Sequence, residues 1–369
     1  MRLLSFVAAA AVVLVLPAFV FTPARAAGMP TAEDFAVPRY RHVFVIMGEN
    51  KNRERIIGSQ YAPRLTQLAQ TYGDASNFFG EVHPSQANYV ALVGGSTYGI
   101  HDDDAYYCAA GSTDANCPGA KTPGYVPHTI DAPNLGTQLE AAGLTWKNYN
   151  ESIPAPGSLA VTGSNPVEDG PNAPPYYAVK HSGFMNFASV QKDPRRAEKI
   201  VGYDQLRRDL AANALPSFGL IIPNLCNDMH GMAGPNVPDD CLYAHVFDAT
   251  VRRGDAAMTK VVEMIQSSAA WKSNDNVAIV ITWDENDGLT REGCCGVTPN
   301  APSNFGGGHI AAIVVTNHGP HGAVDPMPYN HYSLLRTIED AFGIRDYLGL
   351  AAATDQGVRP MLPLFRVSR

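Results

Sequence analysis

YRHVFVIM, residues 40–47, is an almost continuous apolar run that is rich in β-branched and aromatic side chains. Such a run is typical of a strand that is buried on both faces within a parallel sheet. Further strands are predicted at 144–149, 218–222, 277–283 and 310–315. The chain is therefore expected to adopt an α/β fold around a mostly parallel sheet.

Segments with an apolar side at helical spacing lie between these strands, at 63–72, after Asn134, at about 246–271 and at 331–342. Strands that alternate with helices are typical of βαβ units. The segments 106–133 and 153–178 are rich in Gly and Pro, so both are predicted to be long loops.

Residues 1–26 have the pattern of a secretory signal peptide, with Arg2, an apolar run and the small-residue cleavage site Ala24-Arg25-Ala26. We therefore expect a secreted protein, periplasmic or extracellular, although an uncleaved N-terminal anchor is the alternative. The sequence shows no repeat, low-complexity linker or charge block that would mark a domain boundary. Residues 27–369 are accordingly expected to form a single domain.

The charge of the chain bears on its partners. It has 27 Lys and Arg residues against 35 Asp and Glu, a formal net charge of −8. This balance disfavours nucleic acids and anionic membrane surfaces as partners. After the signal segment no apolar run is long enough to span a bilayer, so we expect no stable membrane anchor. A monomer or small homo-oligomer is expected.

Six cysteines in an exported chain predict disulfides. Two pairs would close short loops, Cys108–Cys117 and Cys226–Cys241. Cys294 and Cys295 are adjacent, and they could bond each other or take separate partners, because a vicinal bridge is strained.

A candidate nucleophile lies in the heptapeptide His83-Pro84-Ser85-Gln86-Ala87-Asn88-Tyr89, which runs into an apolar, helix-compatible segment. The Pro-Ser pair would place the Ser85 hydroxyl at a helix N-terminus. Free backbone N–H groups and the positive end of the helix dipole can hold an oxyanion there. Serine at this position is also a common N-cap, so the heptapeptide alone leaves both interpretations open.

Other polar residues follow the predicted strands, at the edge where open α/β sheets form their ligand crevices. They are Glu49, Asn50, Asn227, Asp228, His230, Asp284, Glu285 and His309. The basic pair Lys180-His181 ends a long loop and suits a phosphate oxygen. We expect these side chains to share one site with Ser85.

The sequence Asp284-Glu285-Asn286-Asp287 places three acids within four residues at the end of a buried strand. Burying them is costly unless a cation neutralises their charge, so a divalent metal ion is predicted. Because the expected ligands are oxygens, Ca²⁺ or Mg²⁺ is expected rather than Zn²⁺. An alkoxide beside such a cation is typical of phosphoryl or sulfuryl transfer. Acyl transfer fits less well, because no Gly-x-Ser-x-Gly elbow surrounds Ser85.

Six motifs occur in order between about residues 40 and 350: GEN (48–50), HPSQANY (83–89), KHSGF (180–184), PNLCNDMHG (223–231), TWDEND (282–287) and NHYSLLRTIEDAFG (330–343). Together they resemble the bacterial secreted phosphoesterases of the alkaline phosphatase superfamily, which include acid phosphatases and phosphocholine-preferring phospholipases C. The chain resembles the compact acid phosphatases, some of which act on phosphatidylinositol 3-phosphate, more than the larger phospholipases. Ala87 and Ser182-Gly183 depart from the family pattern, which has proline there.

The resemblance implies an alkaline-phosphatase-like sheet flanked by helices on both faces and a phosphoseryl intermediate at Ser85. It implies metal ligands at Glu49, Asn50, Asp284 and Glu285. Asn88 matches an asparagine that the wider superfamily aims at a phosphoryl oxygen. His181, Asp228 and His230 match other active-site positions of the family.

We accordingly predict a phosphatase that acts on phosphomonoesters of small molecules or lipid headgroups. The residues expected to bind the phosphoryl group are Lys180, His181, Asn227, Asp228 and His309. His230 is expected to protonate the leaving alkoxide, with His309 as the second candidate. A second metal ion held by Asp228, His230 and His309 is an alternative.

Three rival functions stay open on the sequence. A phospholipase C or other phosphodiesterase could use the same residues, because loops decide between monoester and diester substrates. A non-catalytic phosphate- or cation-binding protein is possible on the same scaffold. A sulfatase is disfavoured, since Ser85 lacks the Cys/Ser-x-Pro-x-Arg context in which sulfatase nucleophiles mature.

Overall fold

The computed structural model describes residues 36–104, 106–113, 117–243, 247–296 and 306–367, and the predicted signal peptide at 1–26 lies outside these ranges. An eight-stranded sheet with the strand order β12-β2-β11-β9-β1-β8-β4-β7 forms the middle layer of the described domain. Its strands are β1 (His42–Gly48), β2 (Gly73–Ala75), β4 (Trp146–Asn150), β7 (Ile200–Val201), β8 (Phe218–Ile222), β9 (Val277–Trp283), β11 (Ala312–Thr316) and β12 (Ala323–Asp325).

β1, which contains most of the apolar run at 40–47 from which a parallel sheet was predicted, lies in the middle of this sheet. It pairs in parallel with β8 on one side and with β9 on the other. All seven residues of β1 and all seven of β9 are buried, as their apolar sequences predict. β4 continues the parallel arrangement beyond β8, whereas β11 runs antiparallel between β9 and β2. The mostly parallel α/β sheet is therefore confirmed, and the carboxyl ends of β1, β8 and β9 meet at one edge.

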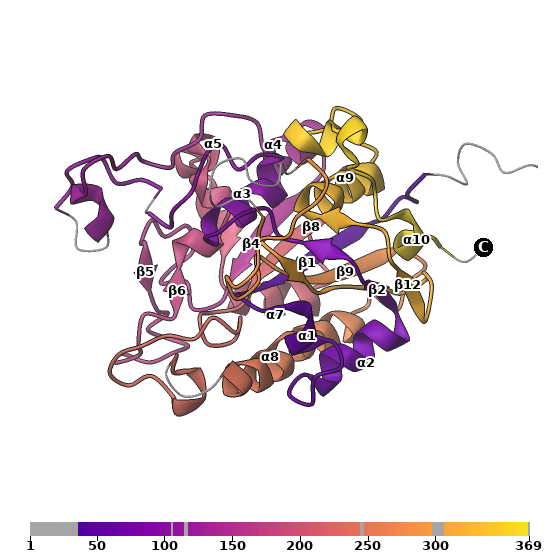
Figure 1. Cartoon of the computed structure of the whole chain (residues 1–369), viewed down its shortest axis with the longest axis horizontal. Coiled ribbons are helices and arrows are strands. Elements are labelled where there is room, and N and C mark those ends of the chain that lie inside the picture. The colour runs from indigo at the N-terminus through magenta and orange to yellow at the C-terminus, as the bar shows by residue number, and fades with distance from the viewer. Residues whose placement is uncertain (1–35, 105, 114–116, 244–246, 297–305, 368–369) are drawn as a thin grey trace, which may run out of the picture. The chain divides into compact units, whose positions relative to one another are not determined.

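Helices cover both faces of the sheet, as expected (Figure 1). Figure 1 shows α3, α4, α5 and α9 over one face and α1, α2, α7 and α8 over the other. The helices are α1 (Arg53–Ile56), α2 (Pro63–Thr71), α3 (Gln86–Gly94), α4 (Leu135–Ala141), α5 (Ala188–Gln191), α6 (Arg196–Lys199), α7 (Tyr203–Ala211), α8 (Phe247–Ser267), α9 (His331–Phe342) and α10 (Leu362–Phe365). Within the described ranges, none of them is both long and apolar enough to cross a bilayer.

Local signals in the sequence explain where several helices begin and end. Asn134 caps α4, because its Oδ1 accepts from the Thr137 N–H at 3.2 Å while Thr137 Oγ1 accepts from the Asn134 N–H at 3.0 Å. α3 ends at Gly95, whose φ of 72° is left-handed. A Cβ at Gly95 would also lie 2.2 Å from the Leu348 carbonyl oxygen, so only glycine fits there.

Two smaller sheets arise from short segments. β3 (Phe78–Phe79) pairs with β10 (His309–Ile310) on one side and with β13 (Tyr329–Asn330) on the other. This sheet brings the segment before Ser85 beside the N-terminus of α9. β5 (Thr162–Gly163) pairs with β6 (Tyr177–Ala178), so part of the loop predicted at 153–178 is a hairpin.

Three disulfides are present in the described residues. Cys108–Cys117 and Cys226–Cys241 are bonded, which confirms both expected short loops. Cys294 and Cys295 bond each other, so the alternative of separate partners is wrong.

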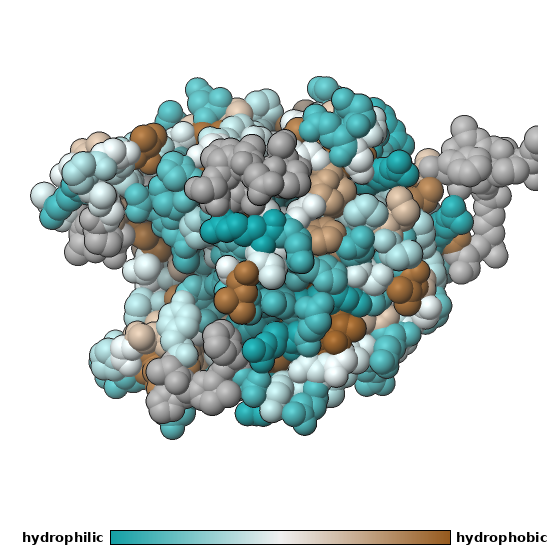
Figure 2. Space-filling model, in the orientation of Figure 1, coloured by the Kyte–Doolittle hydropathy of each residue, from teal (hydrophilic) through white to brown (hydrophobic). Residues whose placement is uncertain are grey.

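Figure 2 shows hydrophobic residues scattered over one face of the molecule rather than gathered in a large patch. The exposed large hydrophobic residues belong to separate segments, and Leu289, Tyr243 and Val126 are among them. Isolated exposed apolar side chains are normal on soluble domains.

Candidate active site

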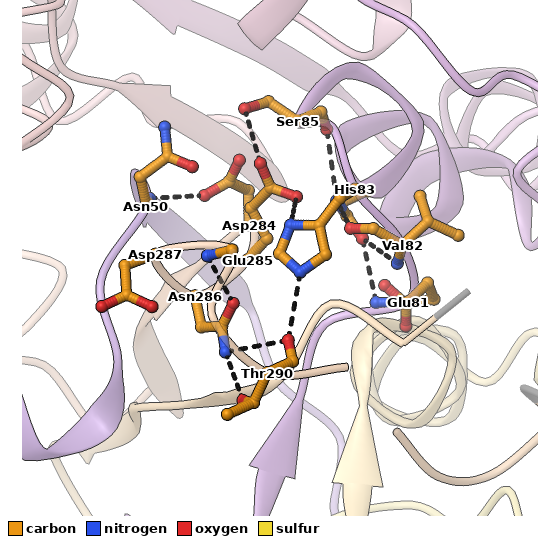
Figure 3. Close-up of polar contacts among 12 residues, drawn as sticks. Asn50, Glu81, Val82, His83, Ser85, Asp284, Glu285, Asn286, Asp287 and Thr290 are labelled. Carbon is orange, nitrogen blue, oxygen red and sulfur yellow. Dashed lines mark hydrogen bonds and ion pairs between the residues drawn. The ribbon is translucent and has the colours of Figure 1, made fainter. Parts of the chain in front are cut away.

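Ser85 lies at the N-terminus of α3, and Figure 3 shows its side chain beside the carboxyl group of Glu285. Its side chain is buried, and its Oγ donates to Glu49 Oε2 at 3.0 Å and lies 3.4 Å from Glu285 Oε1. α3 is buried along its whole length, so it holds the hydroxyl rigidly in the interior. The structure thus brings the predicted nucleophile against two of the predicted metal ligands.

These carboxyl groups come from strands that are neighbours in the sheet. Glu49 follows β1, and Asp284 and Glu285 follow β9, which is paired to β1 along its whole length. The Asn50 N–H donates to Asp284 Oδ1 at 3.0 Å, and Asn50 Nδ2 donates to Glu49 Oε2 at 3.1 Å. All four predicted metal ligands therefore meet at one edge of the sheet.

Asp228 joins the cluster from the loop that follows β8. The Glu49 N–H donates to the backbone oxygen of Asp228 at 2.8 Å, which ties the ends of β1 and β8 together. Asp228 Oδ1 accepts from the His230 N–H at 2.7 Å, so the carboxyl group also shapes the loop that carries the histidine. Glu49, Asp228 and Asp284 have no exposed surface.

The pKa values of Glu49 and Asp228 lie well above their usual range. Burial is the largest cause, and the neighbouring acids of the cluster raise these pKa values further. Burial is also the largest cause that raises the pKa of Asp284, and it raises that of Glu285 to about 7. Lys51 is buried beside them and donates from Nζ to the Met229 carbonyl oxygen at 2.8 Å. Lys51 and Lys180 both act on these acids, but two lysines do not balance four carboxyl groups, so the site favours additional positive charge.

The donor set fits a divalent cation. Within the described residues, Asp284 Oδ2 is buried without a hydrogen-bond partner, although its neighbour Oδ1 is bonded. An unpartnered carboxylate oxygen in the interior is costly unless a cation binds it. Carboxylate, amide and hydroxyl oxygens are the ligands that Ca²⁺ and Mg²⁺ prefer.

Two histidines form the opposite side of the site. His181 Nε2 lies 3.1 Å from Glu49 Oε1, and its Nδ1 lies 3.4 Å from Asp228 Oδ2. The side chains of Glu49, His181 and His230 place one ligand atom each within 4.8 Å of the others. Burial lowers the pKa of His181 well below its usual range and that of His230 to about 4. These neutral rings can accept a proton or bind a metal ion.

Tyr89 fixes the orientation of this histidine side. Its hydroxyl donates to Glu49 Oε1 at 2.6 Å, and its ring stacks on that of His181 with 5.2 Å between the centroids. The hydroxyl of Tyr243 lies 2.6 Å from His230 Nδ1 and 2.8 Å from Nε2.

Lys180 and Asn227 have partners of their own in the structure. Lys180 Nζ lies 2.7 Å from Asp103 Oδ2, and although burial lowers the pKa of Lys180, Asp103 raises it further, so the ammonium stays charged. Asn227 Nδ2 donates to both carboxyl oxygens of Glu151 at 2.9 Å, and its Oδ1 accepts from Arg253 Nε at 2.8 Å. Lys180 therefore remains a candidate phosphate ligand, whereas the Asn227 amide is occupied.

Two other predicted contacts are replaced by different ones. Asn88 Oδ1 accepts from the N–H groups of Glu81 at 2.9 Å and Val82 at 3.1 Å, and its Nδ2 donates to the Val82 carbonyl at 2.9 Å. The amide thus holds the turn before Ser85 and is not aimed at a phosphoryl oxygen. His309 Nε2 bonds the Ser76 carbonyl at 3.0 Å, and its Nδ1 lies 3.3 Å from Glu54 Oε1. The histidine ring recorded beside His230 is that of His181, at 5.6 Å between the centroids. A second metal ion at Asp228, His230 and His309 stays a prediction.

Sequence reasoning assigned no role to His83, Lys51, Tyr89 or Tyr243. His83 and Tyr89 stand within the heptapeptide, and Lys51 directly follows Glu49-Asn50, so their proximity to predicted ligands was a usable signal. Tyr243 is far from any motif in the sequence and reaches His230 through the folded loop closed by Cys226–Cys241.

The sequence matches the profile described as the Phosphoesterase family over residues 58–345. It is 28% identical over 316 residues to phosphatidylinositol-3-phosphatase of Mycobacterium tuberculosis, which covers 84% of this chain and 79% of that protein. Phosphate-repressible acid phosphatase of Penicillium chrysogenum is 27% identical, over 76% of this chain and 54% of that protein. Hemolytic phospholipase C of Pseudomonas aeruginosa is 24% identical, over 58% of this chain and 30% of that protein.

Among solved structures, a protein in the alkaline phosphatase superfamily from Vibrio parahaemolyticus has a TM-score of 0.50 at 10% identity, covering 84% of this chain and 68% of that one. The lipoteichoic acid synthase LtaP from Listeria monocytogenes has a TM-score of 0.51 at 11% identity, covering 91% of this chain and 78% of that one. At these identities the likeness shows a common fold, which confirms the expected alkaline-phosphatase-like architecture.

Proposed function

The chain belongs to the Phosphoesterase family and is a phosphoric ester hydrolase, and from this premise we propose that it hydrolyses phosphomonoesters through a phosphoserine at Ser85. The observation that carries the proposal is the position of Ser85 Oγ, at the first turn of α3 and 3.0 Å from Glu49 Oε2. A hydroxyl at a helix N-terminus beside a carboxylate can lose its proton and attack phosphorus. The end of the helix favours the negative phosphoryl oxygens that arrive with the substrate.

In the first step a bond forms between Ser85 Oγ and phosphorus, and the bond from phosphorus to the leaving oxygen breaks. Glu49 Oε2 is the acceptor that the serine proton already faces. His230 donates a proton to the leaving alkoxide, because a bound phosphate dianion raises the pKa of a neighbouring imidazole. In the second step a bond forms between the water oxygen and phosphorus, and the bond from phosphorus to Ser85 Oγ breaks to release inorganic phosphate. His230 takes back a proton from the water, and the proton on Glu49 returns to Ser85 Oγ.

Glu49, Asn50, Asp284 and Glu285 would hold a divalent cation, and Asp284 Oδ2 is the buried oxygen that lacks a partner among the described residues. Such a cation supplies positive charge that favours the serine alkoxide and the developing phosphoryl charge. The oxygen ligands favour Ca²⁺ or Mg²⁺. The group Glu49, His181 and His230 is the second candidate site, and its two imidazoles favour Zn²⁺ instead.

A phosphorylated small molecule or lipid headgroup is the substrate class that this site supports. Lys180 and His181 provide a cation and a ring nitrogen for the phosphoryl oxygens. The relative from Mycobacterium tuberculosis is named phosphatidylinositol-3-phosphatase, and this similarity favours a lipid headgroup as the substrate. Similarity to a phospholipase C over 58% of this chain keeps a phosphodiesterase as the rival function.

We place the enzyme outside the cytoplasm, as a single domain over residues 27–369 that follows a cleaved signal at 1–26. The three disulfides support this location, since such bonds form in oxidising compartments. A monomer or small homo-oligomer without a membrane anchor is the expected state.

Hydrolysis of p-nitrophenyl phosphate and of its bis ester, with Ser85→Ala beside the parent protein, tests this function. Ser267→Ala is the matched control, because Ser267 is exposed near the end of α8. We expect monoester hydrolysis that Ser85→Ala abolishes and Ser267→Ala preserves, with acid-stable phosphate on Ser85 after rapid quenching. Faster bis ester hydrolysis would establish the phosphodiesterase instead. Metal binding without turnover of either ester would favour a non-catalytic binding protein.

A further inference from the structure

Glu81 and His331 form an ion pair in the interior, where neither side chain has any exposed surface. His331 Nδ1 lies 2.5 Å from Glu81 Oε2, and the backbone N–H of His331 donates to Glu81 Oε1 at 2.9 Å. The other ring nitrogen, Nε2, lies 2.9 Å from the Trp283 carbonyl oxygen. An ionised Glu81 and a carbonyl oxygen are both acceptors, so together they would hold a proton on each ring nitrogen and make the ring an imidazolium. His331 opens α9 within the motif NHYSLLRTIEDAFG, to which the mechanism gives no role.

This pair connects two parts of the active site. On one side, Trp283 is the last residue of β9 and directly precedes Asp284 and Glu285. On the other side, the Glu81 N–H donates to Asn88 Oδ1 at 2.9 Å. Asn88 lies in the first turn of α3, three residues after Ser85. Figure 3 shows Glu81 and Val82 beside Ser85 and the Asp284-Glu285 pair.

The backbone around Gly80, next to Glu81, is closely packed against the segments that carry Asp284 and Gly307-Gly308. A Cβ at Gly80 would lie 2.6 Å from the backbone oxygen of Asp284, so the backbone segments at Gly80 and Asp284 are in contact. The Gly80 N–H donates to the Gly308 carbonyl and the Gly307 N–H donates to the Gly80 carbonyl, both at 3.0 Å. A change in the Glu81–His331 pair therefore reaches Ser85 and Asp284 through rigid contacts.

We infer that Glu81 and His331 are positioning residues, which set the distance between Ser85 Oγ and the carboxyl groups of Asp284 and Glu285. Neither residue touches a reacting atom, and both act through backbone that leads into the site. Although burial lowers the pKa of His331, the charge of Glu81 raises it above its usual value, in agreement with two protons on the ring. The effect on catalysis rests on the proposed serine chemistry, whereas the charge state of His331 does not.

The charge state is tested on the full-length parent protein by nitrogen-15 and proton NMR of labelled histidine, with His331→Gln identifying the signals. At neutral pH we expect His331 to show protons on both ring nitrogens, with the Nδ1 proton shifted far downfield. A ring with one proton would overturn the inference. This measurement needs no activity, so it stands even where the proposed function fails.

The positioning role is tested with Glu81→Gln, which keeps the length of the side chain but removes its charge. We expect kcat per folded molecule to fall by about tenfold or more with KM within about twofold of the parent value, since no contact with substrate is lost. Glu339→Gln is the matched control, because Glu339 is a buried carboxyl group on the same helix α9. Its kcat should stay at the parent value.

The double variant Glu81→Gln/His331→Gln separates positioning from stability. Removing both charges leaves no unpaired buried ion, so the melting temperature should recover relative to either single variant. The kcat should nevertheless stay low, because the double variant lacks the Glu81–His331 ion pair that positions Ser85 relative to Asp284 and Glu285. Recovery of kcat together with stability, or a single variant with unchanged kcat per folded molecule, would overturn the positioning role. If the parent protein lacks turnover, the proposed function has failed and the NMR result alone decides.

Discussion

His83 Nδ1 lies 2.5 Å from Glu285 Oε2, while the other oxygen of the same carboxyl group lies 3.4 Å from Ser85 Oγ. The histidine therefore holds Glu285 by one oxygen and turns the second oxygen toward the nucleophile (Figure 3). Burial lowers the pKa of His83, but its contact with Glu285 raises it further, so the net shift is upward. A protonated His83 would also offset one of the negative charges at this edge of the sheet.

We expect His83→Ala to lower kcat/KM for p-nitrophenyl phosphate, because Glu285 loses the donor that orients it. Loss of a hydrogen bond to a charged group costs about 1.5 to 3 kcal/mol, which corresponds to a roughly 10- to 100-fold decrease. His83→Gln should retain more activity, since glutamine keeps a donor. His101→Gln is the control on an exposed histidine of the same region. Equal kcat/KM for His83→Ala and the parent protein would contradict the role.

Divalent cations should stabilise the protein against unfolding, and the two candidate sites can be told apart by this effect. At a cation concentration of about 100 times Kd the expected gain is ~2.7 kcal/mol. If the oxygen site is used, the gain with Ca²⁺ or Mg²⁺ disappears in Asp284→Asn and persists in His230→Ala. A gain with Zn²⁺ that depends on His230 would assign the ion to Glu49, His181 and His230. Thermal unfolding after chelation, with each ion added back, measures both.

Asp103→Asn should weaken substrate binding more than it slows turnover. Asp103 Oδ2 pairs with Lys180 at 2.7 Å, while its Oδ1 accepts from the Gln86 N–H at 3.0 Å. Asparagine keeps an acceptor for Gln86 but loses the charge that holds Lys180. Because the pair is partly exposed, we expect KM to rise by about 3- to 10-fold with little change in kcat. Asp102→Asn is the neighbouring control, and a KM equal to that of the parent would refute the role of Asp103.

Glu339 should make stability depend on pH. Burial raises its pKa from 4.5 to about 8, and its Oε2 has no hydrogen-bond partner among the described residues. The folded state then binds a proton that the unfolded state has released, so stability falls as pH rises from about 4.5 to about 8. Glu339→Gln should remove this slope and be more stable than the parent by on the order of 3 kcal/mol at the alkaline end. Urea unfolding across this range measures the difference, and parallel curves for both proteins would contradict it.

The central strands were predictable because a strand buried on both faces is apolar at every position, as in β1 and β9. The outer strands of the sheet could not be predicted from the sequence. β2 has three residues, Gly73–Ala75, and β7 has two, so neither is long enough to show a pattern. The direction of β11 was also hidden, since a buried apolar run reads alike in a parallel and an antiparallel pair.

The candidate site was predictable in part for a similar reason. Parallel strands end at one edge of a sheet, which brings Glu49 and Asp284 together whatever the loops do. The direction of single side chains was not predictable from their order. Asn88 lies in the first turn of a helix, where side chains lean toward the N-terminus, and it therefore reaches back to Glu81 and Val82. His309 follows a glycine run, and its ring is set by pairing between β10 and β3.

The bond between Cys226 and Cys241 closes the loop that carries Asp228 and His230 and that ends next to Tyr243. A newly made chain in a reducing compartment lacks this bond, and the loop then loses the covalent link that holds its two ends together. The histidine side of the site would be least ordered there, whereas Glu49 at the end of β1 and Ser85 at the N-terminus of α3 lie outside the loop that this bond closes. If the chain is exported as proposed, oxidation of Cys226 and Cys241 would therefore order the His230 side of the site only after the chain has left the reducing compartment.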